Sequence, residues 1–284
     1  MTGAEPVALV FGTLLAFAVG SFICVVIDRL PIELEEPNEY GDLYDTRPWG
    51  EVLGGHSRCS SCGEPVQARD NIPVLSWLLL RGRCRGCGEP IPAFHPIVEL
   101  LVPLLFLGAV WVVGWDWRLL PVLGLIPAGV AISVIDLRTM IVPTRIVWPG
   151  FALAVAMSLI ASGIQSEWAW LLTALVGLAT LAGPLFVLWF ILPKGMGFGD
   201  VRLSVLLGWV VGFYGGTKPV AGLLLAVLAL FISAVVGLIT GVPAMATQGR
   251  KAKVPWGPSL FAAALTVIAL AEPFLEPFGV YAIG

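Results

Sequence analysis

Charged side chains are scarce in this sequence of 284 residues: only 12% of the residues are charged, whereas 58% are hydrophobic. A soluble domain carries about 25% charged residues, so the composition excludes an ordinary water-soluble enzyme. It also excludes a disordered chain, which needs low hydrophobicity and high charge. The net charge is −3 and the sequence pI is about 5.4, so the chain offers no basic surface for a nucleic acid.

The hydrophobic residues gather in long runs. A helix needs about 20 apolar residues to cross a bilayer core about 30 Å thick. Eight runs approach this length, at 7–27, 97–113, 119–135, 146–164, 168–192, 201–217, 219–242 and 258–279. No repeat has the length of a helix pair, so a repeat-built transporter gets no support. We predict an all-α polytopic membrane protein with about eight transmembrane helices, embedded in a lipid bilayer.

Lysine and arginine are almost missing from one side of the expected bundle. If the N-terminus lies outside, every Lys and Arg except Arg118 and Lys218 falls in an inner loop. Cytoplasmic loops keep an excess of these cations, so we predict this orientation. Glu5 is the only charged residue among residues 1–11, whereas a cleavable signal peptide would carry Lys or Arg there. We therefore expect a retained helix.

Only five cysteines occur, and four of them belong to one duplicated pattern. The sequence R-C-x-x-C-G-E-P, followed by an apolar residue, fills 58–66 and again 83–91. Two Cys-x-x-Cys turns supply four sulfurs, which form a closed tetrahedral set suited to structural zinc. The predicted ligands are Cys59, Cys62, Cys84 and Cys87. A disulfide or redox pair is the alternative, although cytosolic thiols stay reduced. Cys24, in the first run, is expected to be a small buried hydrophobic residue.

These features divide the chain into three parts. We expect a first transmembrane helix over 1–28, a cytosolic loop over 29–96 that contains the zinc-knuckle hairpin at 58–91, and a transmembrane bundle over 97–284. The acidic stretch 33–51 of the loop is expected to be solvated, and we assign it no chemistry.

Acidic side chains are rare in the apolar runs, where a charge costs about 2.5–3.5 kcal/mol. Asp28 and Glu99 lie at the inner boundary, where a neighbouring cation or a favourable helix N-terminus can account for them. Asp136 ends the third run, and Asp200 opens the sixth, directly after the glycine-rich stretch 195–199. The expected topology places Asp136 and Asp200 at the same depth on the same face.

Two carboxylates that approach within a few Å cannot both ionise easily, so one keeps a proton. One can then act as a general base on water and the other as a general acid, as in an aspartic protease. Gly197 and Gly199 would let the backbone approach closely, although an N-cap aspartate after a glycine turn explains this pattern about as well. Asp136 and Asp200 are therefore the candidate catalytic pair, with Gly197 and Gly199 in support, although the sequence does not say whether their helices touch.

At these residues the chain resembles the prepilin peptidases, also called type IV leader peptidases, of the Gly-x-Gly-Asp intramembrane aspartyl protease class. The matches run in order through most of the chain. They are Gly20-Ser21-Phe22, Arg29-Leu30-Pro31, the cysteine tetrad, Asn71 to Leu78, Arg81 to Cys84, Pro96 to Leu100, Asp136 with Pro143, Gly195 to Asp200, and Gly257-Pro258. Thr144, Arg202 and Trp256 stand where the family usually has Asp, Lys and Phe.

The resemblance implies that 97–284 is an aspartyl protease bundle in the bacterial cytoplasmic (inner) membrane. Its catalytic residues would be Asp136 and Asp200, at a site that faces the cytosol. The implied substrates are type IV prepilins, or the related pseudopilins of type II secretion, whose short basic leader is removed. Many members also methylate the new N-terminus with S-adenosylmethionine. No Gly-rich nucleotide loop marks where that cofactor would bind in this sequence.

Two alternatives stay open from the sequence. The chain could be a transporter or assembly subunit with a zinc-stabilised docking loop, but the expected helix interiors hold almost no charge that would mark a pathway. It could also keep the family scaffold and act mainly as a methyltransferase.

Overall fold

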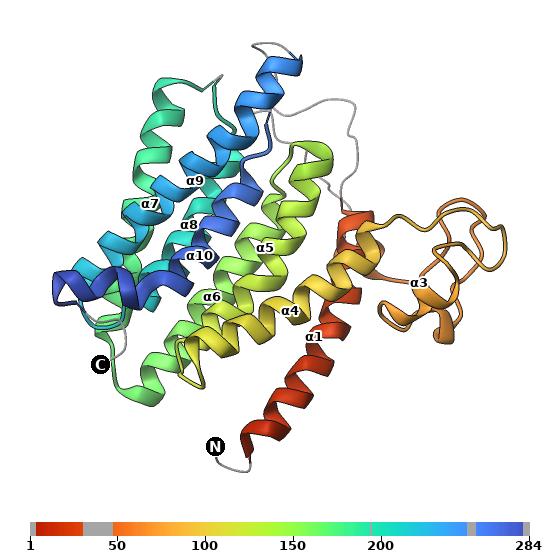
Figure 1. Cartoon of the computed structure of the whole chain (residues 1–284), viewed down its shortest axis with the longest axis horizontal. Coiled ribbons are helices and arrows are strands. Elements are labelled where there is room, and N and C mark those ends of the chain that lie inside the picture. The colour runs from red at the N-terminus through yellow and green to blue at the C-terminus, as the bar shows by residue number, and fades with distance from the viewer. Residues whose placement is uncertain (1–3, 31–47, 194, 249–253, 281–284) are drawn as a thin grey trace. The chain divides into compact units, whose positions relative to one another are not determined.

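The computed structural model describes residues 4–30, 48–193, 195–248 and 254–280. The predicted acidic stretch therefore lies mostly outside the described residues. Eight long helices are present in the described part of the chain (Figure 1), and they confirm the predicted all-helical architecture. Their bounds are α1 (Ala4–Arg29), α4 (Phe94–Val113), α5 (Leu119–Thr139), α6 (Thr144–Gln165), α7 (Ala169–Ile191), α8 (Phe198–Tyr214), α9 (Pro219–Gln248) and α10 (Gly257–Leu275).

Seven of these helices are long and apolar enough to cross a membrane, which makes the chain a multi-pass membrane protein. The remaining one, α8, has 17 residues and is not among the seven. Large apolar side chains such as Trp111, Phe190 and Phe231 are exposed. Their exposure fits a surface that contacts lipid instead of water.

Several helix boundaries differ by a few residues from the apolar runs, and α8 and α9 show why. The helix α8 covers 198–214, whereas the apolar run suggested 201–217, because the helix starts within the glycine-rich stretch directly after Gly197. The helix α9 continues through Pro243, where the apolar run stops, to Gln248. Hydropathy reports the apolar part of a helix, and a helix can extend beyond it.

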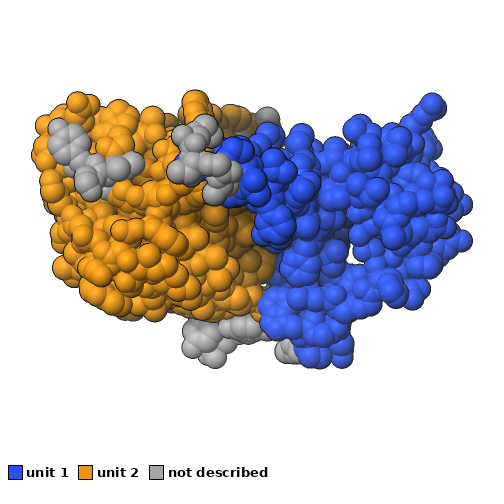
Figure 2. All heavy atoms as spheres, turned by 90° about the horizontal axis from the view of Figure 1, so that it is seen from below, with its two compact units in different colours: residues 1–108 blue, residues 109–284 orange. Residues whose placement is uncertain are grey.

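The chain forms two compact units (Figure 2), Met1–Gly108 and Ala109–Gly284. The first unit contains α1, the short helices α2 (Trp49–Leu53), η1 (Ala68–Asp70) and α3 (Leu75–Leu79), and the first part of α4. The second unit contains α5 to α10 and the terminal turn η2 (Glu276–Phe278).

The helix α8 is the core of the second unit. It packs against α5, α6, α7, α9 and α10, and nearly all of its side chains from Val201 to Tyr214 are buried. Its backbone approaches α7 so closely that a Cβ on Gly177 would lie 2.4 Å from the Cα of Gly212. Because α8 is enclosed by other helices, it has no continuous polar face.

Candidate active site and metal site

Asp136 lies in the last turn of α5. The helix ends at Thr139 because Met140 adopts a left-handed conformation (φ 57°), with its N–H bonded to the Asp136 carbonyl at 2.8 Å. Pro143 then precedes the first residue of α6. The Asp136 side chain is buried, with 4% exposure, so this helix end directs a carboxylate into the second unit.

Asp200 is the third residue of α8, whose N-cap is Gly197. Its backbone N–H donates to the Gly197 carbonyl at 3.2 Å, and its side chain is only partly exposed. The start of α8 packs against the end of α5, where a Cβ on Gly199 would lie 2.7 Å from Val142, and this packing brings Asp200 toward Asp136. Their catalytic roles stay predictions.

The start of α10 adds a third polar group beside these acids. The Gly257 N–H donates to Oδ2 of Asp136 at 2.9 Å in a buried hydrogen bond. Three helix ends, those of α5, α8 and α10, therefore converge on one acidic centre.

The two glycines of the motif have different surroundings. A Cβ on Gly199 would lie 2.7 Å from the Cβ of Val142, in the turn before α6. A Cβ on Gly197 would lie 3.6 Å from Oδ2 of Asp200, which is an ordinary contact. Gly199 therefore permits the close approach of α8 to the turn after α5, whereas Gly197 has room for a side chain.

Arg202, on α8, contacts Thr144, the first residue of α6. The Arg202 guanidinium donates from Nη1 to Oγ1 of Thr144, at the start of α6, and its centre lies 4.9 Å from the Phe198 ring centroid. Arg202 is 5% exposed. The Thr144–Arg202 contact therefore joins the first turns of α6 and α8.

In the first unit, the four cysteines of the duplicated pattern form one cluster. The Sγ atoms of Cys59, Cys62, Cys84 and Cys87 all lie within 4.8 Å of one another. Four thiolates in this arrangement fit a single tetrahedral metal ion. The backbone N–H groups of Cys62 and Ser61 lower the pKa of the Cys59 thiol, whereas the pKa values of Cys62 and Cys87 are raised, in part because the four sulfurs lie so close together. Cys24 is buried elsewhere in α1, as predicted.

The two Cys-x-x-Cys segments have the same local structure. In the first, the Cys59 N–H donates to the Glu64 carbonyl at 2.9 Å, and in the second the Cys84 N–H donates to the Glu89 carbonyl at 2.8 Å. Gly63 and Gly88 each follow the second cysteine with φ near +75° (73° and 75°), a conformation that side chains disfavour. The sequence repeat is thus a repeat of one local turn, which each time presents two cysteines.

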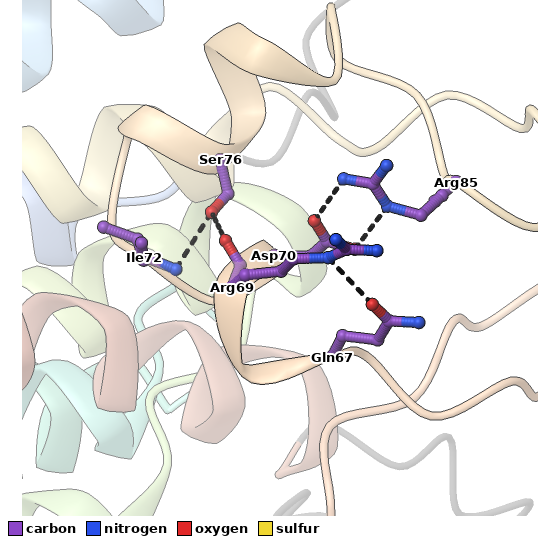
Figure 3. Close-up of polar contacts among 6 residues, drawn as sticks. All are labelled: Gln67, Arg69, Asp70, Ile72, Ser76 and Arg85. Atoms are coloured by element: carbon purple, nitrogen blue, oxygen red, sulfur yellow. Dashed lines mark hydrogen bonds and ion pairs between the residues drawn. The ribbon is translucent and has the colours of Figure 1, made fainter.

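Polar contacts join the segment between the two turns to the second of them (Figure 3). Arg85 donates from Nη2 and Nε to both carboxylate oxygens of Asp70, at 2.7 and 2.8 Å. The Arg85 guanidinium holds the pKa of Asp70 below its usual range. The Ser76 hydroxyl accepts the Ile72 N–H and donates to the Arg69 carbonyl. These bonds give a small segment, with little apolar core, a defined structure.

Two family models match this chain, and they divide it in nearly the same place as the two compact units. A family model described as the bacterial Peptidase A24 N-terminal domain matches residues 14–113, and one described as the type IV leader peptidase family matches residues 123–242. The chain is 32% identical over 271 residues to the prepilin leader peptidase/N-methyltransferase of Stutzerimonas stutzeri, covering 90% of this chain and 89% of the relative. This chain belongs to the type IV leader peptidase family.

Other members of the type IV leader peptidase family are similarly related. The proteins of the same name from Aeromonas hydrophila and Neisseria gonorrhoeae are 34% and 30% identical, and cover 89% and 90% of this chain and 87% and 88% of their own length. No solved structure matches the chain. The resemblance inferred from the sequence is confirmed.

One contact of this family member was not anticipated from its sequence. The Val74 N–H donates to Oε2 of Glu99, on α4, at 2.7 Å. Val74 has φ 61°, which is rare for a β-branched residue and costs backbone energy. Glu99 therefore holds a strained turn of the loop beside α4. The only hint in the sequence was an acid near a helix start, which the helix dipole explained sufficiently.

Proposed function

We propose that this chain is an intramembrane aspartyl endopeptidase that removes the short basic leader of type IV prepilins or pseudopilins. The observation that carries the proposal is the convergence of Asp136 and Asp200, from the ends of two different helices, beside the Gly257 N–H. Membership of the type IV leader peptidase family supports the same reaction.

In the proposed reaction, one carboxylate takes a proton from a water molecule while the water oxygen attacks the scissile carbonyl. The other carboxylic acid gives its proton to the leaving amide nitrogen as the C–N bond breaks. The intermediate is tetrahedral, and no covalent bond to the enzyme forms. A helical peptide bond is shielded, so the substrate must be extended at the cut, which a glycine before the cut makes easier.

The cysteine cluster would hold Zn²⁺ in a structural role. Four thiolates leave no open coordination position for a water or a substrate. The ion would connect the two Cys-x-x-Cys turns, which have little apolar core of their own, and so fix the loop. We assign it no part in the hydrolysis.

The location and the second activity are part of the same proposal. We place the chain in the bacterial cytoplasmic membrane with the N-terminus outside and the two aspartates at the cytosolic face, with α8 as an eighth crossing. The cation distribution supports this orientation. The names of the relatives support methylation of the new N-terminus by S-adenosylmethionine. We assign no residue to the methyl donor.

Incubation of the purified protein in detergent with a prepilin, followed by mass spectrometry of the product, tests the proposal. Loss of the leader is expected, and a further gain of one methyl group when S-adenosylmethionine is present. Asp136→Asn and Asp200→Asn should each abolish cleavage while the protein stays in the membrane. Cleavage by either variant at the wild-type rate would refute the dyad, and an unchanged prepilin would favour the subunit alternative.

A further inference from the structure

Gly257 has an environment that the proposed dyad alone does not explain. It is the first residue of α10, and the first N–H groups of a helix have no partner within the helix. The Gly257 N–H is directed at Oδ2 of Asp136, at 2.9 Å, and both groups are buried. The next residue, Pro258, has no N–H to compete for this acceptor.

The position also requires the absence of a side chain. A Cβ on Gly257 would lie 2.8 Å from Oδ2 and 3.4 Å from Cγ of Asp136, and 3.5 Å from Leu203. The contact with Oδ2 is shorter than real Cβ contacts allow, so the Asp136 carboxylate would have to move. The hydrogen bond and the steric limit are two independent observations, and both involve Oδ2 of Asp136.

The residue before Gly257 fixes the start of the helix. The Trp256 indole donates from Nε1 to the Ser233 carbonyl, on α9, at 3.2 Å. Its ring lies against Gly237 of the same helix, where a Cβ would be 2.9 Å from Nε1. The N-terminus of α10 is therefore held by α9 on one side and meets Asp136 on the other.

We propose that Gly257 is a positioning residue of the dyad: its N–H fixes the Asp136 carboxylate through Oδ2 and leaves the other oxygen for the proton exchanged with water. This inference rests on the proposed function, and it extends the site to a third helix. A fixed carboxylate reduces the reorganisation needed in the transition state. Loss of this contact should therefore slow the chemical step and leave substrate binding unchanged.

The test is Gly257→Ala, compared with the wild type for kcat, KM and melting temperature in detergent. The new Cβ would displace the Asp136 carboxylate, so kcat should fall by about tenfold or more with KM within about twofold. Gly183→Ala, on α7, is the matched control, because a Cβ there meets nothing within 4 Å. This control should keep the wild-type kcat.

A second variant covers the case in which Gly257→Ala does not fold. An ester analogue, in which oxygen replaces only the amide N–H of Gly257, removes the donor and adds no atom that could clash. It should also lower kcat by about tenfold or more. Wild-type kcat in the ester analogue, or a loss confined to KM, would overturn the inference. A wild-type protein that does not cleave a prepilin would instead refute the proposed function.

Discussion

The Sγ atoms of Cys59 and Cys87 lie 3.8 Å apart, although the two residues belong to different turns of the loop. In a tetrahedral site with Zn–S bonds of about 2.3 Å, neighbouring sulfurs are separated by about 3.8 Å. The apolar environment of a core cannot explain this spacing, because Cys62 and Cys87 are exposed. The cluster therefore has the dimensions of a metal site before any ion is considered.

The first prediction is that the purified protein contains about one zinc ion per chain. Cys84→Ser should remove most of the zinc, because a site with three thiolates and a hydroxyl binds the ion much more weakly. Elemental analysis of protein purified without chelators measures this. The control is Cys24→Ser, which changes a cysteine outside the cluster and should leave the zinc content unchanged. Absence of zinc from the wild-type protein would contradict the prediction of a zinc site.

The second prediction concerns the carboxylate that holds Val74. Glu99→Ala should release the strained turn, since the Val74 N–H loses its acceptor, at a cost of about 1–3 kcal/mol. Hydrogen exchange of residues 72–80 should become faster, while the zinc content stays the same. Glu99→Gln keeps the side-chain length and an acceptor oxygen, so it should retain most of the protection against hydrogen exchange. Equal exchange in the wild type and Glu99→Ala would contradict the role of Glu99.

The third prediction separates the two glycines of the motif. Gly199→Ala should reduce kcat by about tenfold or more, because the new Cβ would lie 2.7 Å from Val142 and displace the first turn of α8, with Asp200 in it. Gly197→Ala should keep kcat within about threefold, since its Cβ makes only ordinary contacts. Prepilin cleavage under saturating substrate measures both. The reverse order of the two effects would show that the approach of α8 to Val142 is unimportant.

Much of this architecture could be predicted from the sequence. The runs of apolar residues are local and gave all eight long helices, and the duplicated Cys-x-x-Cys pattern gave the complete sulfur cluster. The convergence of Asp136, Asp200 and Gly257 could not be derived from the hydropathy pattern. Helices that contact both lipid and protein are apolar on all sides, so no polar or apolar face shows which helices they pack against. The expected topology placed the two acids at the same depth, but only the family resemblance indicated that their helices touch. The Val74–Glu99 bond depends on an unusual backbone conformation, for which hydropathy gives no signal.

The fourth prediction uses the contact between Arg202 and Thr144. Thr144→Asp should stabilise the protein by about 1–3 kcal/mol, because a carboxylate would lie beside a buried guanidinium and at the first residue of α6, where the helix dipole favours negative charge. Thr144→Ala should destabilise it by about 1 kcal/mol through loss of the hydroxyl acceptor. Melting temperatures in detergent compare the variants. A lower melting temperature for Thr144→Asp than for Thr144→Ala would contradict this account of the pair.

The last prediction concerns a buried cation in the second unit. The Arg118 side chain is 5% exposed and lies 5.5 Å from the Trp170 ring and 5.8 Å from the Tyr214 ring. Its Nε and Nη2 donate to the Asp116 carboxylate at 2.8 and 3.2 Å. Burial raises the pKa of Asp116, but the hydrogen bonds from Arg118 outweigh this effect and hold the pKa below its usual value of 3.8.

Because the pKa of Asp116 is lower in the folded protein than in the unfolded chain, this ion pair stabilises the fold fully above about pH 4 and loses its effect as the pH falls through the lowered value. Asp116→Asn should therefore cost about 2 kcal/mol at pH 7, since it leaves the guanidinium without a counter-charge. The gap in melting temperature between the variant and the wild type should narrow as the pH falls below 4. Glu167→Gln, which neutralises an exposed acid of the same unit, should show no such gap at pH 7. A gap for Asp116→Asn that stays constant from pH 7 to pH 3 would show that the carboxylate acts through its shape and not through its charge.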